Sequence, residues 1–141
     1  MTPDDEQHLR RAIALAAEAR AAGNRPFGAL LVLEGAVIAE DRNTVIADDD
    51  IAAHPELKLA RWAARELDRD RAARTTMFTS CMPCAMCGEA IRRAALGRVV
   101  YALSPEQLRQ LAPDPDQTSP TYEGPALFDE ARVPFEGLVE P

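Results

Sequence analysis

The chain has 141 residues, 47% of them apolar, and a formal net charge of −7. This length predicts a single domain, residues 1–141, with a core of its own. Nucleic-acid binding depends on lysine and arginine side chains that neutralise phosphates, so the acidic balance argues against a nucleic-acid partner. The sequence contains no apolar run of membrane-spanning length and no signal-peptide pattern, and we therefore expect a cytoplasmic protein with no membrane partner.

Helical and extended patterns alternate along residues 4–103. The predicted elements are a helix over residues 4–22, strands over 29–33 and 36–39, a polar loop over 41–50, a helix over 55–71, a strand over 75–79, a helix over 83–95 and a strand over 98–103. This order predicts an α/β domain of three layers, with the sheet between helices.

Individual residues refine the first two helices. Leu9, Ile13 and Ala16 recur at helical spacing and are expected to face the core. His8 lies among charged residues of the same helix and is expected to be solvated. Pro55 suits the first position of the second helix, where its missing N–H is tolerated, so His54 should stand at the entrance to that helix.

The C-terminal segment, residues 104–141, differs in composition from the rest of the chain. It holds seven of the eleven prolines. We expect a short helix over residues 106–111, a loop over 113–125 and a last strand over 133–139.

The three cysteines, Cys81, Cys84 and Cys87, lie too close together to staple a fold with disulfides, and such a cluster indicates metal binding or redox chemistry. A zinc ion that takes part in a reaction needs three protein ligands and one open position. Cys84 and Cys87 at a helix start place both sulfurs on one side of a turn, where backbone N–H groups favour thiolates. With His54 at the start of the other helix, these residues predict a site for one zinc ion.

Two other interpretations of the cysteines remain open. Cys81 as a fourth ligand would close the site and make the zinc structural. However, the backbone before Pro83 is expected to be extended, and this conformation does not direct the Cys81 sulfur toward the other two sulfurs. A C-x-x-C pair is also used for redox chemistry in thioredoxin-like proteins.

Five segments carry a wider pattern: Arg25–Ala29, Asn43, His54-Pro55-Glu56, Thr79–Cys87 and Arg98–Ala102. An H-x-E followed by P-C-x-x-C is the signature of zinc-dependent nucleobase deaminases and is far more specific than C-x-x-C alone. Together the segments resemble the cytidine-deaminase-like superfamily, in particular its branch of guanine deaminases and tRNA adenosine deaminases. The resemblance covers roughly residues 5–103.

The resemblance implies a mixed five-stranded sheet flanked by helices and a homodimer. It also implies one zinc ion (Zn²⁺) per subunit, held by His54, Cys84 and Cys87. Glu56 is then the catalytic residue, which carries protons from the zinc-bound water to the substrate.

Substrate contacts are also implied by the resemblance. Asn43 should hydrogen-bond the substrate ring and Phe27 should line its pocket; a turn residue and a core residue are the alternatives. The chain departs from the family pattern at Pro55, where alanine is usual and its N–H can face the substrate, and at Met82, where glutamate is common. Because proline offers no such donor, Pro55 is expected to alter the base preference.

We expect hydrolytic deamination of a small amino-substituted heterocycle, a free nucleobase such as guanine or a related purine, pyrimidine or triazine base. The alternatives are a tRNA adenosine deaminase and a non-catalytic structural zinc module. The acidic charge, Pro26-Phe27-Gly28 and Ser80-Cys81 favour the guanine deaminase side. A lid over the site is expected only from the segment around Tyr122, Phe128 or Phe135.

Overall fold

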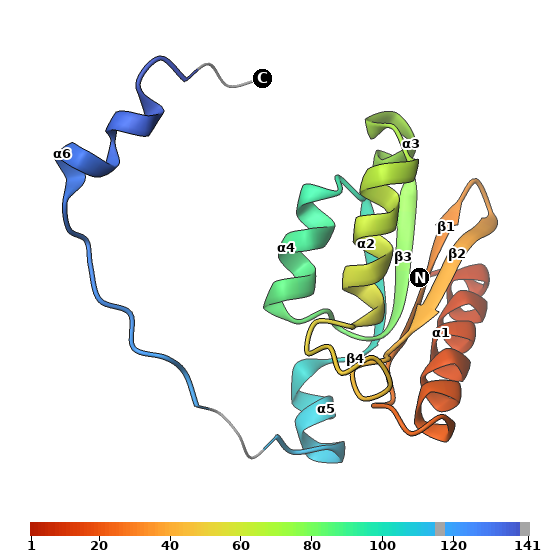
Figure 1. Cartoon of the computed structure of the whole chain (residues 1–141). Helices are drawn as coiled ribbons and strands as arrows, with labels where there is room; N and C mark the ends of the chain where they lie inside the picture. The colour runs from red at the N-terminus through yellow and green to blue at the C-terminus, as the bar shows by residue number, and fades with distance from the viewer. Residues whose placement is uncertain (115–117, 139–141) are drawn as a thin grey trace.

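The computed structural model describes residues 1–114 and 118–138, and within them four strands form one mixed sheet in the order β2–β1–β3–β4 (Figure 1). The strands are β1 (Gly28–Leu33), β2 (Ala36–Arg42), β3 (Thr75–Cys81) and β4 (Arg98–Leu103). β1 runs antiparallel to β2 and to β3, whereas β3 and β4 are parallel. A tight turn joins β1 to β2, and a helix joins the parallel pair.

Helices cover both faces of the sheet. α1 (Pro3–Ala21) packs on one face, and α2 (Pro55–Glu66) and α4 (Ala85–Arg93) lie side by side on the other (Figure 1). The shorter helices are α3 (Arg69–Ala73), α5 (Pro105–Leu111), α6 (Phe128–Ala131) and the 3-10 turn η1 (Val133–Phe135). The predicted α/β fold with flanking helices is confirmed, with four strands in the described residues instead of five. No helix in the described part of the chain has the length and apolar character needed to cross a membrane.

Alternate residues of the strands pack into two separate cores, because successive strand side chains point to opposite faces of the sheet. The core under α2 and α4 contains Ala29, Leu31, Leu59, Ala60, Ala63, Met77, Ile91 and Ala94. The core under α1 contains Leu9, Ala12, Leu15, Leu30, Val32, Phe78 and Val100. Burial on both faces explains why β1 is a continuous apolar run.

The buried face of α1 differs in part from the predicted one. Leu9 is buried as expected, but Leu15 packs in the core while Ile13 is 50% exposed. His8, which the sequence predicts to be solvated, is half-buried. Its ring lies 4.9 Å from the ring of Phe78, centre to centre, so the flanking charged residues were a poor guide to its surroundings.

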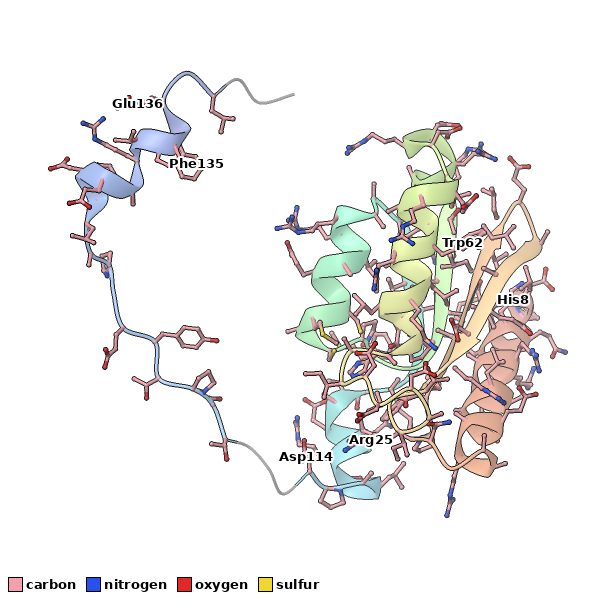
Figure 2. The ribbon with its side chains drawn as sticks, in the orientation of Figure 1. His8, Arg25, Trp62, Asp114, Phe135 and Glu136 are labelled. Carbon is pink, nitrogen blue, oxygen red and sulfur yellow. The ribbon has the colours of Figure 1, made fainter. Side chains whose placement is uncertain are left out.

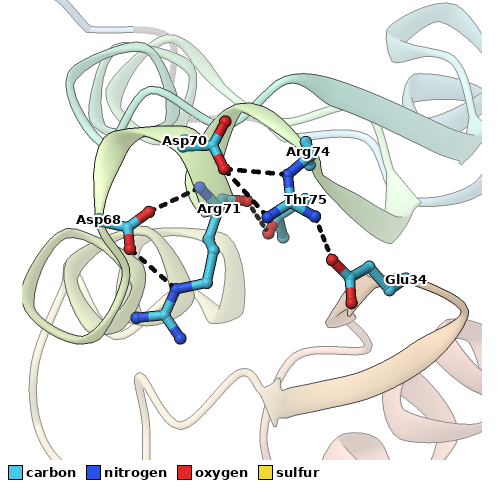
Figure 3. A network of polar contacts seen from close by, with 6 residues as sticks. All are labelled: Glu34, Asp68, Asp70, Arg71, Arg74 and Thr75. Atoms are coloured by element: carbon cyan, nitrogen blue, oxygen red, sulfur yellow. Dashed lines mark hydrogen bonds and ion pairs between the residues drawn. The ribbon is translucent and has the colours of Figure 1, made fainter.

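The predicted helix over residues 55–71 is two helices. After α2, Leu67 takes an extended conformation with φ −111° and ψ 138°. Asp68 then caps α3, because its carboxylate accepts a hydrogen bond from the backbone N–H of Arg71 at 2.8 Å (Figure 3). At the end of α3, Arg74 pairs with Glu34 and thereby ties the helix to the β1–β2 turn.

The predicted last strand over residues 133–139 is wrong. Val133–Phe135 forms the turn η1, and no strand occurs in the described residues 118–138; Val139 lies outside the described part. Pro134 has no N–H to donate to a strand partner, which disfavours a sheet here. The predicted loop over 113–125 is irregular where it is described, and residues 115–117 fall outside.

Residues 118–138 run away from the rest of the protein (Figure 1), and Figure 2 shows Phe135 far from the sheet. The three residues expected to form a lid are exposed: Tyr122 by 89%, Phe128 by 75% and Phe135 by 67%. Within one chain, this segment therefore covers no site.

Gly28 begins β1 at its closest approach to α1. A Cβ placed there would lie 2.5 Å from the carbonyl oxygen of Ala12 and 2.5 Å from Cβ of Leu15, distances that real side chains do not adopt. The N–H of Gly28 also donates to the Ser80 hydroxyl at 3.1 Å, which fixes the start of β1 to the end of β3. Glycine at this position therefore sets how closely α1 packs on the sheet.

Replacing Gly28 with alanine should lower the free energy of unfolding by about 1–3 kcal/mol, because α1 must move away from β1. Urea denaturation followed by circular dichroism measures this change. Gly88→Ala is the matched control, since a Cβ at Gly88 in α4 meets nothing within 4 Å. Equal stability of Gly28→Ala and wild type would contradict the close packing of α1.

Candidate functional site

The residues singled out by the sequence gather at one edge of the sheet. Because β1 is antiparallel to both of its neighbours, β2, β3 and β4 run in the same direction and end at this edge. Asn43 follows β2 and Cys81 ends β3. Helices α2 and α4 begin at the same edge, with His54 and Cys84 as their N-cap residues (Figure 1).

His54, Cys84 and Cys87 form a cluster with the geometry of a zinc site. His54 Nδ1 lies 3.7 Å from Cys84 Sγ and 3.5 Å from Cys87 Sγ, and the three ligand atoms are all within 4.8 Å of one another. Nitrogen and sulfur ligands at ordinary zinc bond lengths of about 2.05 and 2.3 Å are about 3.6 Å apart in a tetrahedron. One imidazole nitrogen and two sulfurs therefore fit a zinc ion with three protein ligands and one open position.

The two thiols of the cluster do not ionise equally. The hydrogen bond from the Cys87 thiol lowers the pKa of Cys84 to about 5, and the same contact raises the pKa of Cys87. Cys84 is exposed at a helix N-terminus, where backbone N–H groups favour an anion, whereas Cys87 is buried. The helix N-terminus and the contact with Cys87 thus favour the thiolate form of Cys84, and a bound divalent cation favours ionisation of Cys87 as well.

Cys81 does not belong to the cluster. Among the described residues, the metal-binding group contains His54, Cys84 and Cys87 without Cys81. Cys81 is 5% exposed, and burial raises the pKa of its thiol, which keeps it protonated. The structure therefore has a three-residue metal cluster and not the closed four-ligand site that the sequence left open.

Glu56 is a buried carboxyl group beside the cluster. It is 5% exposed and lies in the first turn of α2, two residues after His54. The hydroxyl of Thr79, on the central strand β3, donates a hydrogen bond to Glu56 Oε1 at 2.7 Å. Burial raises the pKa of Glu56, although the hydrogen bond from Thr79 opposes the shift.

Thr79 is a site residue that the sequence interpretation missed. Its hydroxyl oxygen lies 2.7 Å from Glu56 Oε1 and 3.0 Å from the carbonyl oxygen of Cys81, and its one hydrogen can serve only one of them. When Glu56 is ionised, Thr79 donates to it; when Glu56 is protonated, the acid can donate to Thr79, whose hydrogen then turns to Cys81. The Thr79 hydroxyl can therefore pair with Glu56 in both protonation states of the acid. The sequence feature that could have identified Thr79 is its position as a polar residue within a strand predicted to lie between helices.

Asn43 is held firmly in its position, with 2% of its surface exposed. Its backbone N–H donates to the carbonyl of Phe27 at 3.0 Å, and its Oδ1 accepts from the N–H of Val45 at 3.0 Å. The turn role expected as an alternative is therefore present and occupies the side-chain oxygen. Since the oxygen already accepts one hydrogen bond, the amide NH₂ is the better placed group of Asn43 to offer to a ligand.

A cavity of about 110 Å³, the inner cavity, lies over the metal cluster. Its lining residues are Phe27, Asn43, His54, Pro55, Glu56, Cys81, Met82, Cys84 and Leu108. Of the site residues predicted from the sequence, all except Cys87 line it. Leu108 of α5 was not singled out, because periodicity predicts a helix but does not tell which face meets the sheet edge.

A larger cavity of about 570 Å³, the outer cavity, adjoins the inner one. The two share the lining residues Phe27, Asn43, His54 and Leu108. Arg25 and Asp114, both labelled in Figure 2, line the outer cavity only. A third cavity of about 460 Å³ lies against α1 and contains none of the predicted site residues. The candidate site is therefore a small chamber over the metal ligands that widens outward.

Known proteins share this pattern of residues. The family described as "Cytidine and deoxycytidylate deaminase zinc-binding region" matches residues 2–103. A guanine deaminase of Bacillus subtilis (strain 168) is 36% identical over 131 residues, which are 92% of this chain and 83% of that protein. A tRNA-specific adenosine deaminase of Agrobacterium fabrum (strain C58 / ATCC 33970) is 39% identical over 87 residues, which are 60% of this chain and 57% of that protein.

The fold agrees with these matches. The X-ray structure of the guanine deaminase from Bacillus subtilis aligns with a TM-score of 0.77 at 32% identity, over 96% of this chain and 92% of that chain. The matched residues 2–103 include the whole metal cluster, so the family and the donor set both indicate zinc as the cofactor. The resemblance noted in the sequence is confirmed, and the chain belongs to the zinc-binding cytidine and deoxycytidylate deaminase family.

Proposed function

We propose that this protein is a zinc-dependent hydrolytic deaminase of a small amino-substituted heterocycle, a free nucleobase such as guanine or a related purine, pyrimidine or triazine base. The observation that carries the proposal is the buried carboxyl group of Glu56 in the same small cavity as the metal cluster. The 36% identity to a guanine deaminase over 92% of the chain supports a free base as substrate.

In this proposal, His54, Cys84 and Cys87 hold one zinc ion per subunit. When bound, zinc lowers the pKa of a water molecule from about 15.7 toward about 7. Glu56 is the catalytic residue: it would take one proton from the attacking water and deliver it to a ring nitrogen, and then carry the second proton of that water to the amino group, which leaves as ammonia. Because burial raises its pKa, Glu56 can hold the proton between the two transfers. Thr79 orients the carboxyl group through its hydrogen bond.

The same proposal assigns substrate contacts to Asn43, Phe27 and Pro55. The NH₂ group of Asn43 donates to an acceptor on the base, since its oxygen is held by Val45. Phe27 forms a wall of the inner cavity, and Pro55 contributes an apolar surface with no backbone donor. The inner cavity of about 110 Å³ opens into the outer cavity of about 570 Å³, so a single base can lie with its reacting edge at the metal ligands and the rest of its ring toward the outer cavity.

A tRNA adenosine deaminase is the second candidate, favoured by the 39% identity to such an enzyme over 87 residues. The net charge of −7 opposes it, because tRNA binding requires a basic surface. A non-catalytic zinc module is the candidate of a different class. It would bind zinc and release no ammonia from any base, nucleoside or aminotriazine.

We further propose that residues 1–141 act as one deaminase domain, that the chain forms a homodimer, and that it works in the cytoplasm. The homodimer is supported by the exposed apolar residues of the C-terminal segment, which a second copy would cover. The cytoplasmic location is supported by the three clustered cysteines, which are free thiols.

The proposed homodimer should sediment at twice the chain mass of 15.4 kDa when analysed at micromolar concentration. Removal of residues 118–141 should weaken the dimer, because it removes the exposed apolar side chains of that segment. A wild-type protein that sediments at the chain mass over the whole concentration range would contradict the proposal.

Glu56→Gln should retain about one zinc per chain and lose ammonia release by at least about 100-fold, since a positioned proton carrier contributes roughly 10²–10⁴-fold. Zinc is measured by elemental analysis. Ammonia is measured over guanine, adenine, cytosine, isocytosine, aminopterins, aminotriazines and the corresponding nucleosides, with inosine formation in an anticodon stem-loop as a separate assay.

Glu66→Gln is the matched control, because Glu66 is an exposed residue at the end of α2 and should leave turnover unchanged. Near-normal turnover of Glu56→Gln would show that Glu56 is not the proton carrier. Inosine formation without release of ammonia from free bases would replace the proposal with the tRNA enzyme, and zinc binding with neither activity would leave the non-catalytic module.

Pro55→Ala should raise the relative kcat/KM for bases with a ring carbonyl over bases without one by roughly 2- to 13-fold, the effect of one hydrogen bond of about 0.5–1.5 kcal/mol. Alanine restores an N–H at a position that lines the inner cavity. Pro105→Ala is the control, because Pro105 also begins a helix but does not line that cavity. Unchanged relative values over the base panel would refute the role of Pro55.

A further inference from the structure

Lys58 is the one lysine of the chain, and its ammonium group is fully hydrogen-bonded. Its Nζ donates three hydrogen bonds: to Asp41 Oδ1 at 2.9 Å, to the carbonyl oxygen of Arg42 at 2.8 Å and to Thr44 Oγ1 at 2.9 Å. An ammonium group has three hydrogens, so each one is engaged. The side chain is only 27% exposed, which strengthens these contacts relative to a surface ion pair.

The three acceptors of Lys58 flank one site residue. Asp41 and Arg42 are the last two residues of β2 and precede Asn43, and Thr44 follows Asn43 in the loop that leads to α2. Lys58 itself lies in the first turns of α2, and its backbone N–H donates to the carbonyl of His54 at 3.1 Å. The side chain therefore connects the segment around Asn43 to the helix start that carries His54 and Glu56.

Other contacts of this loop hold its own shape but do not make that connection through a side chain of α2. The N–H of Thr44 donates to the carbonyl of Ala53 at 3.1 Å, and its hydroxyl donates to Asp48 at 2.6 Å. The Thr44 hydroxyl accepts from Lys58 at the same time, so the ammonium is linked to the loop interior through it. Without the ammonium, the loop keeps its internal hydrogen bonds and loses its anchor on α2.

We propose that Lys58 is a positioning residue that fixes Asn43 relative to His54 and Glu56, and so sets how tightly the base is held. The proposal rests on the proposed deaminase function and adds a residue that does not line the inner cavity. Lysine suits the task because its three hydrogens diverge and can meet acceptors from three directions. The planar fork of arginine cannot reproduce that arrangement.

Lys58→Met keeps most of the side-chain length and removes the ammonium. We expect KM for the base to rise about 10-fold while kcat changes less than about 3-fold, with zinc content unchanged. Lys58→Arg should fall between Lys58→Met and wild type. Arg61→Met is the matched control, since it removes a positive charge from an exposed position of the same helix and should leave KM unchanged.

A double-mutant cycle separates positioning from general support of the fold. In the Asn43→Ala background, Lys58→Met should raise KM by less than about 2-fold, because the residue it positions is gone. A full rise in that background, a fall in kcat alone, or the same effect from Arg61→Met would overturn the proposal.

Amide hydrogen exchange tests the anchor without turnover. The amides of residues 43–53 should exchange faster in Lys58→Met than in wild type and Arg61→Met, whereas the remaining amides of α2 and β3 should be unaffected. Unchanged exchange over residues 43–53 would refute the anchor. If wild type deaminates no base, the proposed function fails, and the exchange result still decides whether Lys58 holds the loop.

Discussion

The candidate site depends on two helices that begin side by side at one edge of the sheet. α2 and α4 share one core with β1 and β3, and small residues such as Ala60 and Ala63 allow α2 to lie close to the sheet. His54 and Cys84 are the N-cap residues, and neither side chain caps its own helix. Both side chains are therefore available to a metal, and their separation follows from helix packing.

The proposed chemistry requires a carboxyl group that is buried but never left unpaired. Glu56 lies where burial raises its pKa, and Thr79 supplies a hydroxyl that can pair with either protonation state. The hydroxyl comes from β3, which like β1 has a neighbouring strand on each side, so its position is fixed by the sheet ladder. A rigid strand and a helix terminus thus hold the two ends of the hydrogen bond.

Sequence-based prediction succeeds here where the determinants are local. The spacing of Cys84 and Cys87 and the proline after His54 place the ligands at helix starts, which the structure brings together. It fails where an outcome depends on distant residues. The contacts of Thr79 and Lys58 join residues 14 to 23 positions apart, and no periodicity reports such contacts.

The two errors in secondary structure have different causes, one local and one that depends on a distant partner. The helix over residues 55–71 breaks because Asp68 caps a second helix, a local competition that the apolar pattern does not reveal. Residues 133–138 have a strand-like composition, but a strand needs a partner, and within the described chain none lies beside them.

Pro55 connects the fold to the proposed selectivity. At the first position of α2 its fixed φ favours the helix start, and its missing N–H is one that the helix leaves unpaired anyway. The same missing N–H removes a donor from the wall of the inner cavity, next to Glu56. In the proposed function, recognition of the base then falls more heavily on the NH₂ group of Asn43. The geometry of the loop that carries Asn43, and with it the anchor on Lys58, becomes correspondingly more important for holding the base.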